Sequence, residues 1–386
     1  MTSAGAPPDG PPGTRALVVR LDSAGDVLLS GPAVRAVAAG VAPDGEVMLL
    51  CGPQGAAAAR LLPGVDRVAV WDCPWITRSG TEVTSALVGQ LLAAVSAFAP
   101  DVAVILTSFH QSPLPLALLL RLAGVPRIVG ASVDFAGTLL DQRLRPGENL
   151  PEDLPEPRRA LAVARTAGFR LPQGASDHLA VRTPPDASAL TGTGPYVVVH
   201  PGASAPARTW PAASAAAAVA ALADLGVRVV VTGGPAETAL TAAAAAGRAV
   251  DLGGRTDLAT LSGVLADAAV VVATNTGAAH LAAAVGTPVA SVYSPVVPWD
   301  RWAPYGVPVE LLGDQWERCR GTRAVDCPVA GHPCLATIGA EQVVAACRRL
   351  AAVSGRPLLG RPAPSSAPRH RPPTDPLVPV ASGGGS

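Results

Sequence analysis

The sequence predicts an α/β fold with parallel sheets, divided between two domains. Three observations predict it: a length of 386 residues, short β-branched runs that alternate with helical stretches, and one break in that alternation. A chain of this length exceeds the usual single domain. Several runs are apolar throughout, as parallel strands buried on both faces are. The stretches between them have the length that a crossover helix needs.

The predicted strands form two groups, separated by a proline-rich and turn-rich break across roughly 135–192 with one helix over 158–168. We therefore expect a first domain over 14–180 and a second over 190–353, whose final helix is able to pack back on the first domain. Segments 1–13 and 354–386 are rich in Pro, Gly and Ser, so we expect disordered tails. The expected strands are 15–21, 47–51, 67–71, 102–106 and 127–130, then 196–200, 227–232, 270–273, 289–293 and 309–312.

Composition and charge exclude several classes of protein. The formal net charge is zero, all 29 basic residues are arginine, and no basic stripe with interleaved aromatics is present, so nucleic acid is not an expected partner. No stretch reads as a signal peptide or a membrane span. We expect a cytoplasmic protein whose membrane contact, if any, is peripheral.

The first motif, RLDSAGDVLLSGP, covers residues 20–32. A strand ends there, a glycine-containing turn follows, and a helix begins near Asp26. Two interpretations stay open: Asp26 complements the bare amides of the helix start, or it is a general base in a cleft. Ser23 and Gly25 lie in the same turn as candidate acceptor contacts. The full GxGxxG pattern is missing, so a dinucleotide site is not expected in this half.

The second and third motifs predict an anion site at two strand ends. HPGASAPARTWP (200–211) supplies Ser204 and Arg208. Two interpretations of Arg208 stay open: its guanidinium binds a diphosphate, or it is a surface arginine on a plain loop. ATNTGAAHLAAA (273–284) offers the hydroxyl of Thr276 and successive amides through Gly277 and Ala278 at a helix start. His280 lies one turn further on the same helix face. A single histidine at such a position is more often a hydrogen-bonded packing residue than a catalytic one.

Two weaker motifs follow other strands. Thr232, Gly233 and Glu237 are candidates for a ribose or base contact, although Glu237 equally suits a solvated first-turn acid. His110 and Gln111 offer polar groups to an acceptor. The loosely spaced Cys319, Cys327, His332 and Cys334 favour free or packed thiols over structural zinc, so no metal site is predicted.

At these segments the chain resembles glycosyltransferase family 9, the ADP-heptose:lipopolysaccharide heptosyltransferases of bacterial envelope synthesis. The resemblance runs through most of residues 15–350. It is carried by RALVVRLDSAGDVLLSGPAVRA, FHQSPLPLALLLRLAGVPRIVG, VVVHPGASAPARTWP, DLGGRTDLATLSGVLADAAVVVATNTGAAHLAAAVGTPV, SPVVPWDRWAPYG and CPVAGHPCL. It implies a GT-B fold, in which two Rossmann-like domains face each other across a cleft. It also implies an inverting sugar transfer that requires no metal or other cofactor, with acceptor bound in the first half and nucleotide sugar in the second.

The resemblance also implies residue roles. Asp26 matches the family's general base, and Thr276–Ala278 match the groups that hold the diphosphate. Arg208 stands where the family usually has a phosphate-binding lysine, and Glu237 falls near its ribose-contacting acid. Asn275 replaces a common Asp and is kept as a further candidate site residue.

Further departures leave the substrates open. Thr322 replaces a cysteine of some members, and the segment 155–158 replaces a His-containing start of the connecting helix. The arginine-only, alanine-rich composition is typical of a high-GC genome, so the acceptor stays open among an envelope glycolipid, a glycan and a small molecule. A nucleotide-sugar epimerase, for which only His280 and Glu237 would be available as acid and base, and a non-catalytic nucleotide-sugar binder remain the alternatives.

Overall fold

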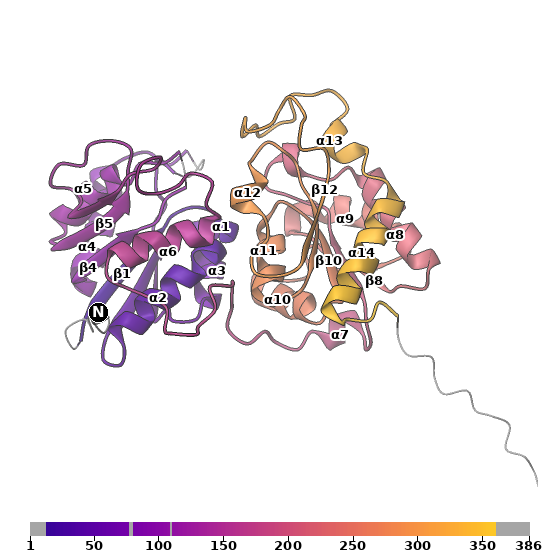
Figure 1. The fold of residues 1–386 in the computed structure, drawn as a ribbon, viewed down its shortest axis with the longest axis horizontal. Helices are drawn as coiled ribbons and strands as arrows, with labels where there is room; N and C mark the ends of the chain where they lie inside the picture. The colour runs from indigo at the N-terminus through magenta and orange to yellow at the C-terminus, as the bar shows by residue number, and fades with distance from the viewer. Residues whose placement is uncertain (1–12, 77–79, 109, 360–386) are drawn as a thin grey trace, which may run out of the picture.

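The computed structural model describes residues 13–76, 80–108 and 110–359, in two halves that lie side by side (Figure 1). The expected tails at 1–13 and 354–386 fall almost entirely outside these residues. Each half contains one six-stranded sheet, and the paired strands run parallel. This arrangement confirms the predicted GT-B class of α/β fold, two Rossmann-like halves that face each other.

The first sheet has the strand order β3-β2-β1-β4-β5-β6 and the second the order β12-β11-β10-β7-β8-β9. The strands of the first are β1 Arg15–Arg20, β2 Glu46–Cys51, β3 Arg67–Val70, β4 Val102–Ile105, β5 Arg127–Ala131 and β6 Gln142–Leu144. Those of the second are β7 Val197–His200, β8 Val229–Val231, β9 Val250–Asp251, β10 Val270–Thr274, β11 Val289–Val292 and β12 Val309–Leu312.

Every predicted strand is present, and the prediction missed β6 and β9. β6 has the sequence QRL, without an apolar run, and β9 is only two residues long, so neither gives a strand pattern. The two sheets fall on either side of the domain boundary that the sequence suggests. The division into domains over 14–180 and 190–353 stays a proposal.

The helices of the first half are α1 Ala24–Leu29, α2 Gly31–Val41, α3 Ala56–Leu61, α4 Ser85–Phe98, α5 Leu114–Leu122 and α6 Glu156–Thr166, with a 3₁₀ turn η1 at Pro53–Gly55. Those of the second half are α7 Ser188–Thr191, α8 Ala212–Asp224, α9 Thr238–Ala245, α10 Leu258–Ala266, α11 Gly277–Ala284, α12 Trp299–Trp302, α13 Pro333–Ala336 and α14 Ala340–Ser354, with η2 at Pro206–Arg208 and η3 at Pro235–Glu237.

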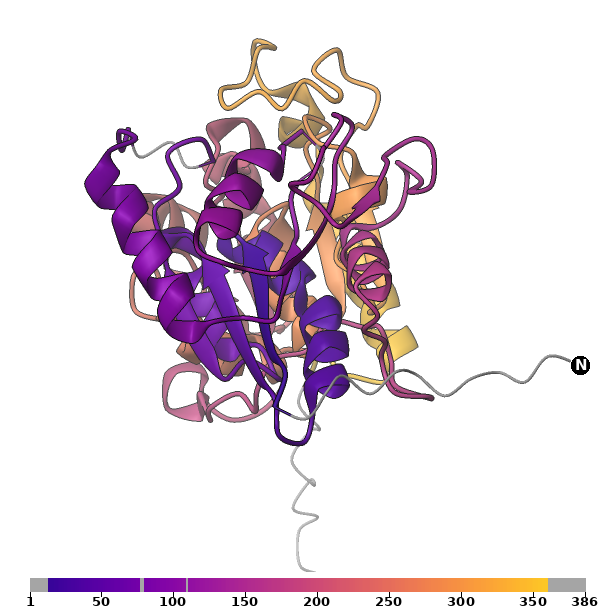
Figure 2. The same ribbon diagram turned by 90° about the vertical axis from the view of Figure 1, so that its left-hand side faces the viewer.

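Alternation along the central strands places helices on both faces of each sheet. In β1, Ala16 and Val18 belong to the core that includes residues of α2 and α6, while Leu17 and Val19 pack with residues of α4 and α5. Figure 2 shows this sandwich edge on, with α2 and α6 on one side of the sheet and α4 on the other. Apolar residues buried on both faces hold the strand ends in place.

The final helix α14 packs in the second half, against α8 and strands β10 to β12 (Figure 1). From the sequence, we had considered that this helix packs back on the first domain. Its main contacts are instead with elements of the second half. Its buried face, which includes Val343, Cys347 and Leu350, belongs to the same core as β7 and α8. This helix therefore packs against one face of the second sheet.

The two halves meet where α1 approaches α11. Both helices begin with small residues, and a Cβ built on Gly25 would lie 3.0 Å from Cδ2 of His280 and 3.4 Å from the backbone of Gly277. Glycine at position 25 therefore permits an approach that a larger side chain would obstruct. As a result, the loops after β1 and β10 face each other.

Candidate active site

A cavity of about 530 Å³ lies between the halves, where loops that follow the strands converge. This volume is within the range of small-molecule sites, and the carboxyl ends of parallel strands are where α/β proteins bind ligands. It brings together predicted residues from both halves. Those that line it are Ser23, Gly25, Asp26, His110 and Gln111 from the first half and Ser204, Arg208, Asn275, Thr276, Gly277 and His280 from the second.

Asp26 presents a carboxylate to this cavity. Its side chain is 19% exposed, accepts a hydrogen bond of 2.8 Å from Oγ of Ser23, and accepts another of 3.0 Å from Nη2 of Arg20. Burial alone would raise the pKa of Asp26, but the charge of Arg20 and the Ser23 hydroxyl bring it below its ordinary value. Asp26 is therefore ionised at neutral pH and oriented by two donors.

Arg20 is the buried centre of this arrangement, and the sequence reasoning missed it. Its guanidinium lies 2.9 Å from Asp22, 3.0 Å from Asp26 and 3.5 Å from Glu156, so one cation faces three carboxylates. Burial would lower the pKa of Arg20, yet these three carboxylates raise it well above its ordinary value. The available signal was a charged residue, Arg20, that directly follows the apolar run ALVV at the end of the strand.

The other two carboxylates of the cluster differ from Asp26. Asp22 accepts hydrogen bonds from Nε2 of Gln111 and Oγ of Ser108, and burial raises its pKa. Glu156, at the start of α6, is 2% exposed and does not line the cavity, and burial raises its pKa as well. Of the three, Asp26 is the one whose pKa is lowered and whose carboxylate is most exposed to the cavity.

Arg208 and the start of α11 line the cavity from the second half. Nη2 of Arg208 donates to Oγ of Ser204 at 2.9 Å, and Nη1 donates to the backbone oxygen of Asn275 at 3.2 Å. Thr276 is the N-cap residue of α11, but its side chain makes no capping hydrogen bond. Its hydroxyl and the amides that begin the helix suit an anion. Ala278 belongs to that helix turn, although its buried side chain does not line the cavity.

His280 lies on α11 beside this site. Burial lowers the pKa of His280 to about 4, partly opposed by Asp26, so the imidazole is neutral at pH 7. Its Nδ1 is buried and has no hydrogen-bond partner. A neutral imidazole can donate or accept a hydrogen bond, but it adds no positive charge to the cavity.

Asn275 joins the ends of β10 and β11. Its amide nitrogen donates to the backbone oxygen of Ser294 at 3.3 Å, and its amide oxygen accepts from the backbone nitrogen of Ser294 at 3.4 Å. The side chain is 5% exposed. Only a group with both a donor and an acceptor can make this pair, which gives a physical reason for an amide here.

The three residues predicted to contact the ribose or base lie outside the cavity lining. Oε2 of Glu237 accepts the backbone N–H of Gly234 at 2.7 Å, the local bond of a first-turn acid. Thr232 is fully buried, and its hydroxyl is 3.0 Å from Nδ1 of His200. Gly233 lies tight against Thr241, where a Cβ would approach within 2.5 Å. These contacts leave a direct role toward a ligand untested.

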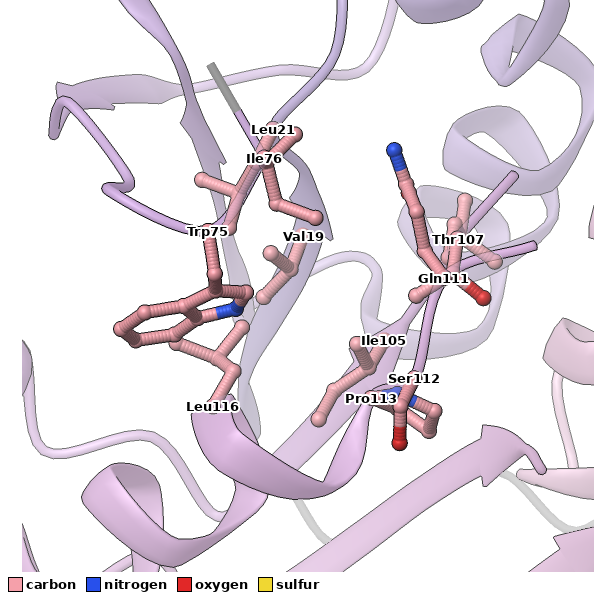
Figure 3. A pocket seen from close by; sticks show the side chains of 11 residues that line it. Val19, Leu21, Trp75, Ile76, Ile105, Thr107, Gln111, Ser112, Pro113 and Leu116 are labelled. Atoms are coloured by element: carbon pink, nitrogen blue, oxygen red, sulfur yellow. The ribbon is translucent and has the colours of Figure 1, made fainter. Parts of the chain in front are cut away.

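A small apolar recess adjoins the cavity in the first half, and the two share Leu21, Ile76 and Gln111 (Figure 3). The indole of Trp75 lies over Leu116 at its edge. The free space is about 10 Å³, roughly that of a single water. The recess therefore belongs to the wall of the cavity.

Cys319 and Cys327, in the loop before α13, and Cys334, within α13, are free thiols. Cys319 and Cys334 are buried, and burial raises the pKa of both thiols, that of Cys334 to about 11. Within residues 13–76, 80–108 and 110–359, no group of three or more His, Cys, Asp and Glu side chains is arranged to hold a metal ion. In the same part of the chain, every helix is too short or too polar to cross a bilayer.

Comparison with solved structures shows the same fold in glycosyltransferases. The ADP-heptose LPS heptosyltransferase II of E. coli is 19% identical, with a TM-score of 0.67 over 89% of this chain and 100% of that one. A family 9 glycosyl transferase from Veillonella parvula is 16% identical, with a TM-score of 0.72 over 89% and 99%. TibC, an iron-containing dodecameric glycosyltransferase from enterotoxigenic E. coli, is 14% identical, with a TM-score of 0.52 over 89% and 77%.

Sequence comparison gives the family. No curated protein matches the chain. The model of glycosyltransferase family 9 (heptosyltransferase) matches residues 110–329, more than half of the 386 residues, and this span carries Arg208, Asn275 and Thr276. Together with the cavity that faces Asp26, this match shows that the chain belongs to glycosyltransferase family 9, the heptosyltransferase family.

Proposed function

We propose that this glycosyltransferase inverts the anomeric centre as it moves a sugar, a heptose of the ADP-heptose type, onto an acceptor hydroxyl. The observation that carries the proposal is the juxtaposition across one cavity of an ionised carboxylate, Asp26, and a phosphate-binding arrangement at Arg208 and Thr276. An inverting transfer needs these two elements on opposite sides of the anomeric carbon.

Asp26 acts as general base in this mechanism. Its carboxylate takes the proton of the acceptor hydroxyl while that oxygen attacks the anomeric carbon. Ser23 and Arg20 hold both carboxylate oxygens, so the group does not have to reorganise before it reacts. The low pKa limits its strength as a base, but it keeps the reactive form populated throughout the physiological pH range.

The departing nucleoside diphosphate is stabilised on the other side. As the bond from the anomeric carbon to the diphosphate oxygen breaks, negative charge develops on that oxygen. Arg208, already positioned by Ser204, and the Thr276 hydroxyl with the amides of Gly277 and Ala278 are placed to receive it. No metal has a part in this mechanism, and that independence of metal is itself part of the proposal.

An epimerase is supported less well. It needs an acid and a base that face the sugar from the second half, and the two candidates were His280 and Glu237. Glu237 lies outside the cavity lining and is bonded to Gly234. A non-catalytic binder was suggested by Asn275, whose amide has a structural partner in Ser294. We place the enzyme in the cytoplasm, with an envelope glycolipid, another glycan or a small molecule as acceptor and at most peripheral contact with the membrane.

The proposal is tested by nucleotide binding. We expect ADP to raise the melting temperature of the protein, because a ligand of the folded state stabilises it. Arg208→Gln should weaken ADP about 10- to 100-fold in calorimetry, the range for a hydrogen bond to a charged group. Arg248→Gln, which changes an exposed arginine paired with Asp224, serves as the matched control.

Two outcomes contradict the proposed donor site: no nucleoside diphosphate binds the wild type, or Arg208→Gln binds ADP as the wild type does. Transfer from ADP-heptose to a panel of glycan acceptors then follows, with and without a chelator. A rate that collapses on chelation and returns with added metal would refute metal independence.

A further inference from the structure

His280, on α11, lines the cavity but has no part in the mechanism described above. The residue is 6% exposed. Its Nδ1 is buried, and no hydrogen-bond partner for this nitrogen exists among the residues that the structure describes. Buried polar groups in proteins are nearly always paired, so an unpaired imidazole nitrogen at the wall of a cavity calls for a functional explanation.

The edge of the imidazole that carries Cδ2 and Nε2 faces the first half. A Cβ built on Gly25 would lie 3.0 Å from Cδ2 of His280, so this edge reaches the point where α1 meets α11. Nδ1 is shielded from solvent, so the ring borders the cavity with the edge that lies away from Nδ1. Since Asp26 directly follows Gly25 in the chain, Nε2 lies on the side of the ring that is turned toward the proposed base.

The surroundings of the two ring nitrogens favour one tautomer of the imidazole. A neutral imidazole carries its proton on Nδ1 or on Nε2, and the nitrogen that carries it is a hydrogen-bond donor. A proton on Nδ1 would be a buried N–H without an acceptor, which leaves its desolvation cost unmet. A proton on Nε2 can instead be bonded to water or to a ligand. The favoured tautomer of His280 therefore presents an N–H donor to the cavity.

The imidazole lies within electrostatic range of both charged groups of the proposed mechanism. Burial lowers the pKa of His280 to about 4, the carboxylate of Asp26 opposes this shift, and the guanidinium of Arg208 adds to it. Thr276 lies one turn earlier on the same face of α11. The ring is therefore close to the path from the diphosphate site to the base, and the transferred sugar has to occupy this path.

An uncharged donor suits this position. When the bond between a sugar and its leaving group breaks, positive charge develops around the anomeric carbon, as in glycoside hydrolysis. A cation beside that carbon would oppose the displacement by repulsion, whereas a neutral N–H can hold a sugar hydroxyl without this penalty. The burial that keeps the imidazole of His280 neutral therefore favours the reaction.

We propose that His280 contacts the sugar of the donor, with its Nε2 N–H donating a hydrogen bond to a hydroxyl of that sugar. This inference rests on the proposed function, since it takes a nucleotide sugar as the donor and Asp26 as the base. Arg208 and Thr276 bind the diphosphate, so His280 adds nothing to the binding of ADP itself. Its contact fixes the sugar so that the anomeric carbon faces Asp26.

Two substitutions separate the two ring nitrogens. Asn places its amide near the position of Nδ1, whereas Gln is one methylene longer and places its N–H near the position of Nε2. We expect His280→Asn to lower kcat/KM for ADP-heptose about 10-fold or more, as loss of a hydrogen bond in the reacting complex does, and His280→Gln to retain most of the activity. In calorimetry, both variants should bind ADP within about 2-fold of the wild type.

ADP-heptoses that each lack one hydroxyl identify the hydroxyl that is bound. Its removal should cost the wild type about 10-fold in kcat/KM and cost His280→Asn almost nothing more, because that variant has already lost the bond. The matched control is His200→Asn, which changes another buried histidine of the second half. His200 lies outside the cavity lining, and its Nδ1 bonds to Thr232. This control should keep the wild-type response to every donor.

Nitrogen NMR of the histidines gives a readout that needs no turnover. In the labelled full-length protein we expect the proton of His280 on Nε2, and we expect the Nε2 resonance to move much further with ADP-heptose than with ADP. The inference is overturned if Nδ1 carries the proton, if ADP alone moves the resonance as far, or if His280→Asn keeps the wild-type kcat/KM. Melting temperatures show whether the variants are folded, and if His280→Asn is not, the wild-type resonance decides.

Failure of the proposed function gives a different result from failure of this inference. If the wild type binds neither ADP nor ADP-heptose, the donor site fails and the role of His280 fails with it. If the wild type binds both and Arg208→Gln weakens ADP as expected, while His280→Asn behaves as the wild type does, only the role of His280 is refuted.

Discussion

Replacement of Asp26 by Asn tests the general base most directly. The substitution retains the shape of the side chain, and its amide oxygen can still accept from Arg20 while its amide nitrogen donates to the hydroxyl of Ser23, but it removes the basic carboxylate. Loss of a general base costs about 10²–10⁴-fold in turnover, equivalent to about 2.7–5.4 kcal/mol of barrier. ADP affinity should stay within about 2-fold, since Arg208 and Thr276 on the opposite side are unchanged.

The charges of the cluster predict that this variant stays folded. One guanidinium, Arg20, faces the carboxylates of Asp22, Asp26 and Glu156, so the formal charge of the group is −2. Neutralising Asp26 loses its attraction to Arg20 but relieves its repulsion by the other two carboxylates. We therefore expect the melting temperature to change by less than about 5 °C.

The assay is release of ADP from ADP-heptose in the presence of an accepted glycan, under saturating donor. Glu156→Gln is the matched control, because it neutralises another carboxylate bonded to Arg20 that does not line the cavity. Its turnover should remain within about 10-fold of wild type. The reasoning about Asp26 is refuted if Asp26→Asn keeps near wild-type turnover, or if Glu156→Gln loses as much as Asp26→Asn does.

Two further predictions concern Asn275 and pH. Asn275→Asp replaces the donor to the oxygen of Ser294 with a buried carboxylate, which should cost about 1–3 kcal/mol at pH 7 and less in acid, as urea unfolding at two pH values can measure. Equal stability of variant and wild type at pH 7 would contradict that role. The pKa of Asp26 lies below its ordinary value, so this base stays ionised in mildly acidic solution. The pKa of His280 is about 4, so its imidazole stays neutral over the same pH values. We expect kcat/KM to be constant from about pH 5.5 to 8, whereas an acid limb near pH 6.5, typical of an ordinary histidine, would argue for a different base.

The sequence predicted the parts of the fold that local pattern determines. Apolar β-branched runs such as VVVH and VVVAT gave the central strands, while β6 and β9 have no such run and follow only from pairing with β5 and β8. Asp26, Arg208 and Thr276 were predicted because each lies in the segment that connects a strand to the next helix or in the first turn of that helix. Their positions at strand ends were enough to predict that they would share a cleft.

The remaining site residues depend on contacts between distant segments. Arg20 was missed because its role comes from three carboxylates, of which Glu156 is 136 residues away. Arg323, which also lines the cavity, lies in an irregular loop and contacts His110 only once the two halves have come together. Thr232 and Glu237 were predicted to contact a nucleotide because they follow a strand, but their side chains make local bonds with His200 and Gly234.

The meeting of Gly25 with the start of α11 has a consequence for how substrates enter. Asp26 and Thr276 are the chain neighbours of the two glycines, Gly25 and Gly277, that touch there. If the halves swing apart to admit ligands, a rotation centred on this point would widen the distant rim while leaving the separation of Asp26 from Thr276 nearly constant. Such a pivot would allow a large acceptor to bind and leave while Asp26 and Thr276 keep their relative positions.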